Sequence, residues 1–129
     1  MSDSISLTSI SVGEALRMCK TTTDIDVIIE LSKHDNPQVR QRALKEMCPC
    51  RVKKDLDDFW RRVVQMIDDE ADNVRMQVLH TLCDGSPQHM EFAVAEALEV
   101  FNRDSNKEIR RKAHKALTSY RTRGKWNIL

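Results

Sequence analysis

The stretches VRQRAL (residues 39–44), VRMQVL (residues 74–79) and IRRKAH (residues 109–114) decide the fold, because they are three copies of one pattern. Their first residues, the anchors Val39, Val74 and Ile109, are 35 residues apart both times. Self-similarity at a fixed period of roughly 20–50 residues indicates a repeat protein, in which each repeat is one supersecondary unit. The sequence therefore predicts a domain built on an internal repeat of 35 residues.

The apolar register extends to both sides of these anchors. Apolar residues recur four and eight positions after each anchor, and eight and eleven positions before it. In chain order these columns are Ala43, Val78, Ala113; Met47, Leu82, Leu117; Leu31, Met66, Phe101; and Ile28, Val63, Leu98. Such spacings place side chains on one face of a helix. Each unit is therefore predicted to consist of two amphipathic helices.

The predicted helices are one near 10–20 and then pairs at 23–33 and 37–48, 55–68 and 72–84, and 88–102 and 106–120. Asn36 before Pro37 is typical of an N-cap followed by proline at the first helical position, and Ser86 before Pro87 repeats that signal. Thr23 with Asp26 resembles a capping box. Gly85 is expected to end a helix by adopting a positive φ.

The predicted fold class is all-α, an α-solenoid of three antiparallel helix pairs with an N-terminal capping helix. A helix pair cannot bury its apolar stripe alone, so about three stacked repeats are needed for a continuous core. We expect one domain over 1–129, with a cap (1–21), three repeats (22–50, 54–85 and 86–120) and a tail (121–129). In the tail, Trp126, Ile128 and Leu129 are expected to cover the far end of the stack.

The pattern resembles the HEAT-repeat family, in particular its short repeats built around V-R-x-x-A-L. The matching residues are Asp35–Arg40 with Ala43 and Leu44, Asn73–Arg75 with Val78 and Leu79, and Ile109 and Arg110 with Ala113. The resemblance covers about residues 23–120. It departs at Ala71, which stands where a capping residue is expected, and at His114, which replaces an aliphatic core residue.

The resemblance implies a role for three anchor arginines, Arg40, Arg75 and Arg110. In the family, such an arginine pairs with a nearby acidic side chain and stacks in a structural ladder along the array. A row of arginines that contacts a ligand is the alternative. The resemblance also implies a protein-binding function, with nucleic-acid binding in some members.

One helix surface stands out as a candidate binding site. We call it the second-helix face, and it consists of the positions two, three and six after each anchor: Gln41, Arg42, Lys45, Met76, Gln77, His80, Arg111, Lys112 and Lys115. Equivalent helices of a solenoid line its concave side, where such proteins usually bind. The candidate partner-binding residues are Arg42, Lys45, His80, Arg111, Lys112 and Lys115. Two flanking acids, Glu46 and Glu108, are expected to lie off these columns.

Charge is distributed unevenly along a chain whose net charge is only +1. Residues 103–129 carry nine Lys and Arg against two Asp and Glu, a local charge of +7, whereas residues 1–36 and 37–102 each carry −3. A basic C-terminal quarter can attract phosphates or an acidic protein surface. A solvated helix face without a partner is the simpler interpretation of the same charges.

No residue constellation favours catalysis, a cofactor or a metal. Cys48, Cys50, His80 and Cys83 can be drawn as a zinc site, but C-x-C is not the usual ligand spacing. Cys48 and Cys83 are equivalent in the repeat, which favours small, partly buried side chains there. Trp60, beside two arginines, is expected to pack in the core rather than stack on a base. We therefore expect a non-catalytic protein.

The leading hypothesis is a binding or scaffold module for protein–protein interaction through the second-helix face, with an acidic or amphipathic protein as partner. The alternative is binding of nucleic-acid phosphates by the same face together with Arg121, Arg123 and Lys125. An enzyme on the same scaffold is a third class, since function resides in sites rather than folds. Four cysteines without a signal peptide or a long apolar run predict a cytoplasmic location, reduced thiols and no membrane.

Overall fold

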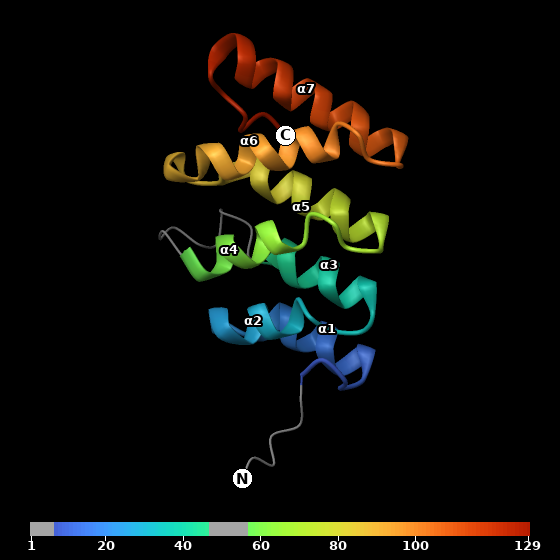
Figure 1. The fold of residues 1–129 in the computed structure, drawn as a ribbon. Coiled ribbons are helices and arrows are strands. Elements are labelled where there is room, and N and C mark those ends of the chain that lie inside the picture. Colours follow the sequence, from blue (N-terminus) through green and yellow to red (C-terminus); the bar gives the residue numbers. More distant parts are fainter. Residues whose placement is uncertain (1–6, 47–56) are drawn as a thin grey trace.

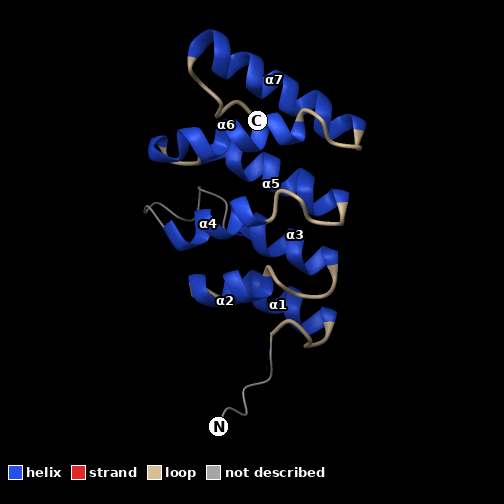
Figure 2. Ribbon diagram, viewed as in Figure 1, coloured by secondary structure: helices blue, strands red, loops and turns tan. Residues whose placement is uncertain are grey.

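The structure, a computed structural model, describes residues 7–46 and 57–129. In these ranges the chain forms seven α-helices and one 3-10 helix, with no strand (Figure 2). The elements are α1 (Val12–Thr21), α2 (Ile25–Leu31), α3 (Pro37–Glu46), α4 (Asp57–Gln65), α5 (Asp72–Gly85), η1 (Gln88–Met90), α6 (Glu91–Phe101) and α7 (Lys107–Arg123). The all-α prediction is confirmed for the described residues.

The helices lie side by side in a stack that runs from α1 at one end to α7 at the other (Figure 1). Helices α1, α3, α5 and α7 form one layer, in which each contacts the next, and α2, α4 and α6 form a second layer in the same way. Contacts between α2 and α3, α4 and α5, and α6 and α7 join the two layers. Each interior helix therefore packs against neighbours both within and across the layers.

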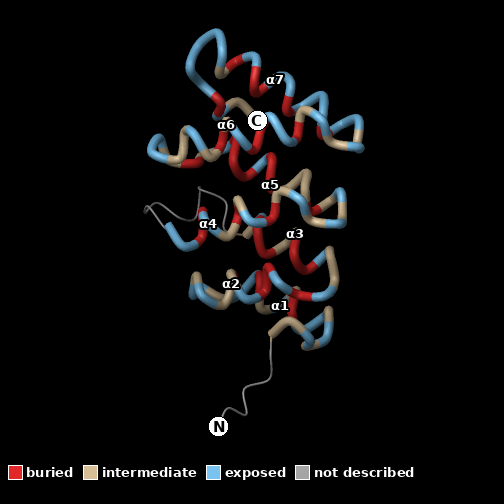
Figure 3. The backbone as a smooth tube through the Cα atoms, in the orientation of Figure 1, coloured by how far each residue is buried: buried red, intermediate tan, exposed pale blue. Residues whose placement is uncertain are grey.

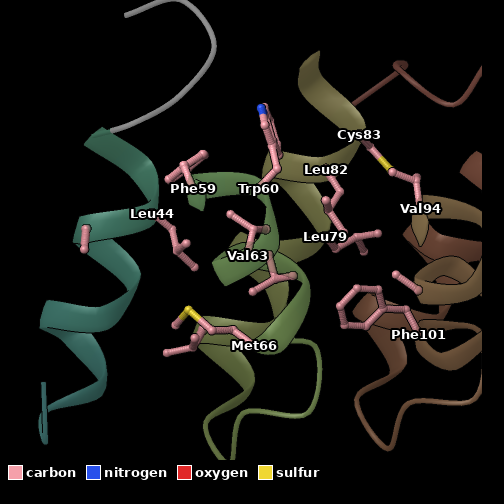
Figure 4. Close-up of a cluster of buried hydrophobic side chains, with 14 of the residues drawn as sticks. Leu44, Phe59, Trp60, Val63, Met66, Leu79, Leu82, Cys83, Val94 and Phe101 are labelled. Carbon is pink, nitrogen blue, oxygen red and sulfur yellow. The ribbon is translucent and has the colours of Figure 1, made fainter. Parts of the chain in front are cut away.

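The predicted apolar columns form the core between these layers. Every column residue that the structure describes is buried, and so are the three anchors. Buried positions follow the inner sides of the helices along the stack (Figure 3), and side chains from α3 to α6 gather in one continuous cluster, from Leu44 across Val63 to Phe101 (Figure 4). Trp60 belongs to this core and lies edge-on to Phe59, with ring centroids 5.2 Å apart. Met47 lies outside the described residues.

Two helix starts differ from the predictions. Asp24, not Thr23, is the N-cap of α2, because its side chain accepts the Asp26 amide at 2.9 Å. Ser86 ends α5 rather than starting the next helix: its hydroxyl donates to the Leu82 carbonyl at 2.6 Å. The chain then makes a 3-10 turn, and α6 begins only at Glu91.

The glycine that closes a helix in the left-handed region is Gly124, with φ 68°. Gly85 is the last residue of α5 and has no positive φ, so its predicted role is wrong. Gly124 adopts the left-handed conformation that other residues avoid, and it therefore caps α7. The helix ends at Arg123, three residues beyond the predicted helix end at residue 120.

After Gly124 the chain turns back towards α5. Trp126 is buried, lies edge-on to Tyr120 and donates its indole N–H to the Ser86 hydroxyl at 2.7 Å. The Leu129 amide donates to the Cys83 carbonyl at 3.2 Å. The tail therefore packs along α5 and α7. The prediction that it covers the far end of the stack is wrong. His114 stays exposed there, although its equivalents Leu44 and Leu79 are buried.

Candidate functional site

The first anchor arginine joins α3 to the turn before α5. Arg40 is buried, and its Nε and Nη2 donate to the two carboxylate oxygens of Asp69 at 3.0 and 2.9 Å. Its Nη1 donates to the carbonyls of His34 and Asp35, both at 2.9 Å. One guanidinium thus closes the turn before its own helix and holds the acidic turn of the next unit in a bidentate pair.

The second anchor arginine repeats this arrangement one unit later. Arg75 donates through Nε and Nη2 to Asp104 at 2.8 and 3.1 Å, and through Nη1 to the Asp69 carbonyl at 2.8 Å. The hydrogen bond to Asp104 raises the pKa of Arg75. Burial alone raises the pKa of Asp104, but hydrogen bonds from Arg75 and from the Asn106 amide outweigh it and hold this pKa below its ordinary value. Asp104 is therefore ionised at neutral pH.

The third anchor arginine keeps the hydrogen bonds to the turn before its own helix but has no carboxylate partner among the described residues. Nη1 of Arg110 donates to the carbonyls of Asp104 and Ser105 at 2.7 and 3.1 Å. Arg110 is exposed, and no carboxylate in the described part of the chain forms an ion pair with it. Its Nε and Nη2 edge, which holds a carboxylate in the other two units, has no such partner here.

His34 takes the place of the aspartate in the first unit, a role that the sequence reasoning missed. It stands 35 residues before Asp69 and is buried. Its Nδ1 accepts the Asn36 amide at 3.0 Å, just as a carboxylate oxygen of Asp69 accepts the Ala71 amide at 2.9 Å. Since Nδ1 accepts, Nε2 carries the proton and donates to the Ile10 carbonyl at 2.7 Å. The ring is therefore neutral. The 35-residue register, which aligns His34 with Asp69, is the signal from which this role could have been predicted.

Three of the predicted partner-binding residues meet in one hollow on the second-helix face. Lys45, His80 and Lys112 come from α3, α5 and α7, and they line a hollow of about 430 Å³. The rest of its lining consists of Gln41, Met76, Gln77 and Leu129. The hollow therefore combines the positive charges of Lys45 and Lys112, from the first and third units, with two apolar side chains.

The other predicted residues on this face are less free than expected. Nη1 of Arg42 lies 3.6 Å from Oε2 of Glu46, and Nη1 of Arg111 lies 2.8 Å from Oε1 of Glu108. Although Glu46 and Glu108 lie off the columns of this face, each pairs with an arginine of the face, four or three residues away on the same helix. Lys115 is exposed and does not line the hollow. Positive charge on this face thus rests mainly on lysines.

The described cysteines are poorly suited to nucleophilic or metal chemistry. Cys19 and Cys83 are free and buried. Burial raises the pKa of Cys19 to about 11, with a further contribution from Glu46, and raises that of Cys83 to about 12. Both are therefore thiols rather than thiolates at neutral pH. No group of three metal-ligating side chains converges within residues 7–46 and 57–129, and Cys48 and Cys50 lie outside them.

Comparisons with known proteins give no match: no model of a protein family, no curated protein and no solved structure is similar to this chain. Within the described ranges, no helix is both long enough and apolar enough to cross a membrane. A functional assignment therefore has to be built from the geometry of the site.

Proposed function

We propose that the chain is an α-solenoid of three antiparallel helix pairs, of the HEAT-repeat type, that acts as a non-catalytic protein-binding module. Support for the solenoid comes from the two-layered helix contacts and from arginine–aspartate pairs that recur 35 residues apart. The partner is another protein, which presents an acidic, amphipathic segment to the second-helix face.

The observation that carries this proposal is the hollow shared by α3, α5 and α7. Lys45 and Lys112 offer charge to carboxylates, while Met76 and Leu129 offer apolar contacts to the same segment. Methionine is flexible and polarisable, so it adapts to partner side chains of different shapes. Charge complementarity would speed the encounter and select against basic partners. A segment with acids on one side and apolar residues on the other matches this lining.

The anchor arginines have a supporting role in the proposed module. Bidentate pairs from Arg40 to Asp69 and from Arg75 to Asp104 tie successive units together. They fix the spacing between the helices that carry Lys45, His80 and Lys112. A site whose charges are already in place loses less conformational entropy when a partner binds.

Nucleic-acid binding is the second candidate, and the positive charge of residues 103–129 favours it. Several of these charges have partners within the protein: Arg121 pairs with Glu99, and Arg123 donates to the Ser119 hydroxyl at 3.0 Å. Glu108 offsets Arg111. Since phosphate binding depends on the number of free cations that reach the backbone, the local pairing favours a protein partner.

The proposed location is the cytoplasm. Its support is the pair of free, buried thiols at Cys19 and Cys83, because free cysteines are usual in reducing compartments.

A double charge reversal tests the proposed function. The variant Lys45→Glu/Lys112→Glu changes the hollow, and Lys20→Glu/Lys33→Glu makes the same charge change at exposed lysines elsewhere. The probes are a labelled helical peptide with glutamates on one face and leucines on the other, and a labelled DNA duplex, both followed by fluorescence anisotropy. We expect the hollow variant to bind the peptide at least tenfold more weakly, and the control to stay within about twofold of wild type.

Two results would contradict the proposal. One is equal loss of peptide binding in both variants, which would make the effect one of net charge alone. The other is tighter binding of the duplex than of the peptide, with an affinity that falls steeply as salt is raised, which would favour the nucleic-acid candidate. Circular dichroism of both variants checks that the helices persist.

A further inference from the structure

The three anchor arginines differ in what their outer edge holds. In all three, Nη1 donates to carbonyls of the turn that precedes the arginine's own helix. In Arg40 and Arg75, the edge formed by Nε and Nη2 holds an aspartate from the following unit. In Arg110 the same edge forms no hydrogen bond or ion pair with a carboxylate of the described residues.

We propose that Arg110 is a preformed receptor for a carboxylate of a docking protein, so that the α7 end of the stack is a second interaction surface. The partner would present an aspartate at a helix-to-helix turn, as the chain itself presents Asp69 and Asp104. This surface lies apart from the hollow on the second-helix face and does not depend on the function proposed for it.

The geometry of Arg110 supports a receptor rather than a freely moving side chain. Two hydrogen bonds to backbone carbonyls, at 2.7 and 3.1 Å, hold Nη1 in place. A guanidinium is planar, so fixing one nitrogen restricts the direction of the other two. Bidentate, charge-assisted hydrogen bonds to a carboxylate are among the stronger polar contacts in proteins. The pairs at Arg40 and Arg75 show which ligand this orientation accepts.

The surroundings of Arg110 favour an acidic partner over an apolar one. His114 is exposed where the inner units bury Leu44 and Leu79 beneath the next unit. Arg103, in the turn before α7, and Lys107, the first residue of α7, are exposed as well. The nearby acids are already engaged, Asp104 with Arg75 and Glu108 with Arg111. The end of the stack is therefore polar and positively charged, which selects for carboxylates.

The test uses the chain's own acidic turn as the probe. A blocked peptide with the sequence of residues 67–73, IDDEADN, contains the aspartate that Arg40 binds. It is titrated into ¹⁵N-labelled protein while the arginine Nε–H signals and the backbone amide signals of α7 are followed by NMR, the latter also reporting binding in variants that lack Arg110. We expect the Arg110 signal to shift in a saturable way towards the positions of the Arg40 and Arg75 signals, with a Kd on the order of 1 mM. A scrambled peptide of the same composition should shift it less.

Matched variants complete the test. Arg110→Ala should weaken binding of the peptide about tenfold, the loss expected for a hydrogen-bonded charge pair. Arg61→Ala, an exposed arginine of α4 that pairs with Asp58, should change it less than twofold. Arg110→Lys, which keeps the charge but not the bidentate edge, should resemble the alanine variant.

Three outcomes would overturn the inference: equal shifts from the scrambled peptide, peptide binding that Arg110→Ala leaves unchanged, or peptide binding that is lost in Lys45→Glu/Lys112→Glu. The last would place the peptide in the hollow and leave the function proposed for the second-helix face intact. Loss of IDDEADN binding in Arg110→Ala but not in Lys45→Glu/Lys112→Glu would support the end surface, whether or not the helical peptide binds at the hollow.

Discussion

The turn before α3 and the turns before α5 and α7 fold alike but differ at one position. His34 in the first turn and Asp69 and Asp104 in the later ones all accept a backbone amide two residues further on. The two aspartates also receive an arginine from the preceding unit. For His34 no such arginine exists in the sequence, since the residue 35 positions before Arg40 is Ile5.

Whether aspartate or histidine is favourable in a turn depends on whether the preceding unit supplies an arginine. A buried carboxylate without a cation is costly because its charge has been removed from water. A neutral imidazole accepts the same amide without that cost, and its second nitrogen donates to the Ile10 carbonyl. Aspartate is therefore favourable only where the preceding unit provides a guanidinium.

The largest expected effect comes from removing an arginine of the inner units. In Arg75→Ala, Asp104 keeps the Asn106 amide but loses both guanidinium contacts while its side chain remains mostly buried. We expect the free energy of unfolding to fall by roughly 1.5–3 kcal/mol, the range for hydrogen bonds to charged groups. Urea denaturation measures it. Arg42→Ala is the control, and loss of its partly exposed pair with Glu46 should cost no more than about 0.5 kcal/mol. Equal small effects would show that the arginine–aspartate pair is not stabilising.

A smaller effect is expected when the first turn is given the residue of the later turns. His34→Asp keeps an acceptor for the Asn36 amide but removes the hydrogen bond to Ile10 and buries a carboxylate without an arginine. We expect a loss of about 1–2 kcal/mol in the free energy of unfolding, again by urea denaturation. A variant as stable as wild type would mean that the turn accepts aspartate without a cation. The comparison between the turns would then lose its physical basis.

Periodicity made most of the fold predictable from the sequence. The columns that contain Ile28, Val63 and Leu98 were set by a fixed spacing, and burial follows directly from it. The helix caps were less predictable, because several polar residues precede α2 and the backbone path decides which side chain accepts which amide. Thr22 accepts the Asp24 amide, and Asp24 accepts the Asp26 amide.

The rest of the site depends on contacts that no local pattern encodes. Trp126 reaches Ser86 across 40 residues, and this contact turns the tail away from the end of the stack. Leu129 then joins the hollow beside Lys112. The lysines of the second-helix face could be identified from their column, but the pairing of Arg111 with Glu108 depends on side-chain rotamers.

Asp104, in the turn before α7, should make the free energy of unfolding depend on pH in acid. The pKa of Asp104 is held below its ordinary value in the folded protein, so the folded state binds fewer protons than the unfolded one between the two pKa values. The stability that this group contributes is present above the unfolded pKa of about 4, and it is lost as the pH falls through the lower folded value. In Asp104→Asn we expect a shallower fall of the unfolding free energy below about pH 4. Parallel curves for wild type and variant would contradict the assignment.

The smallest effect on stability is expected at Arg110, whose outer edge binds no carboxylate of the described residues. Arg110 holds only two carbonyls of an exposed turn, so its removal leaves no buried carboxylate without a partner. We expect Arg110→Ala to lower the free energy of unfolding by no more than about 0.5 kcal/mol, as for most exposed substitutions. Urea denaturation alongside Arg75→Ala gives the direct comparison. If both variants lost the same stability, Arg110 would have to be bonded within the folded chain as fully as Arg75 is. Its outer edge would then not be free for a carboxylate from another protein.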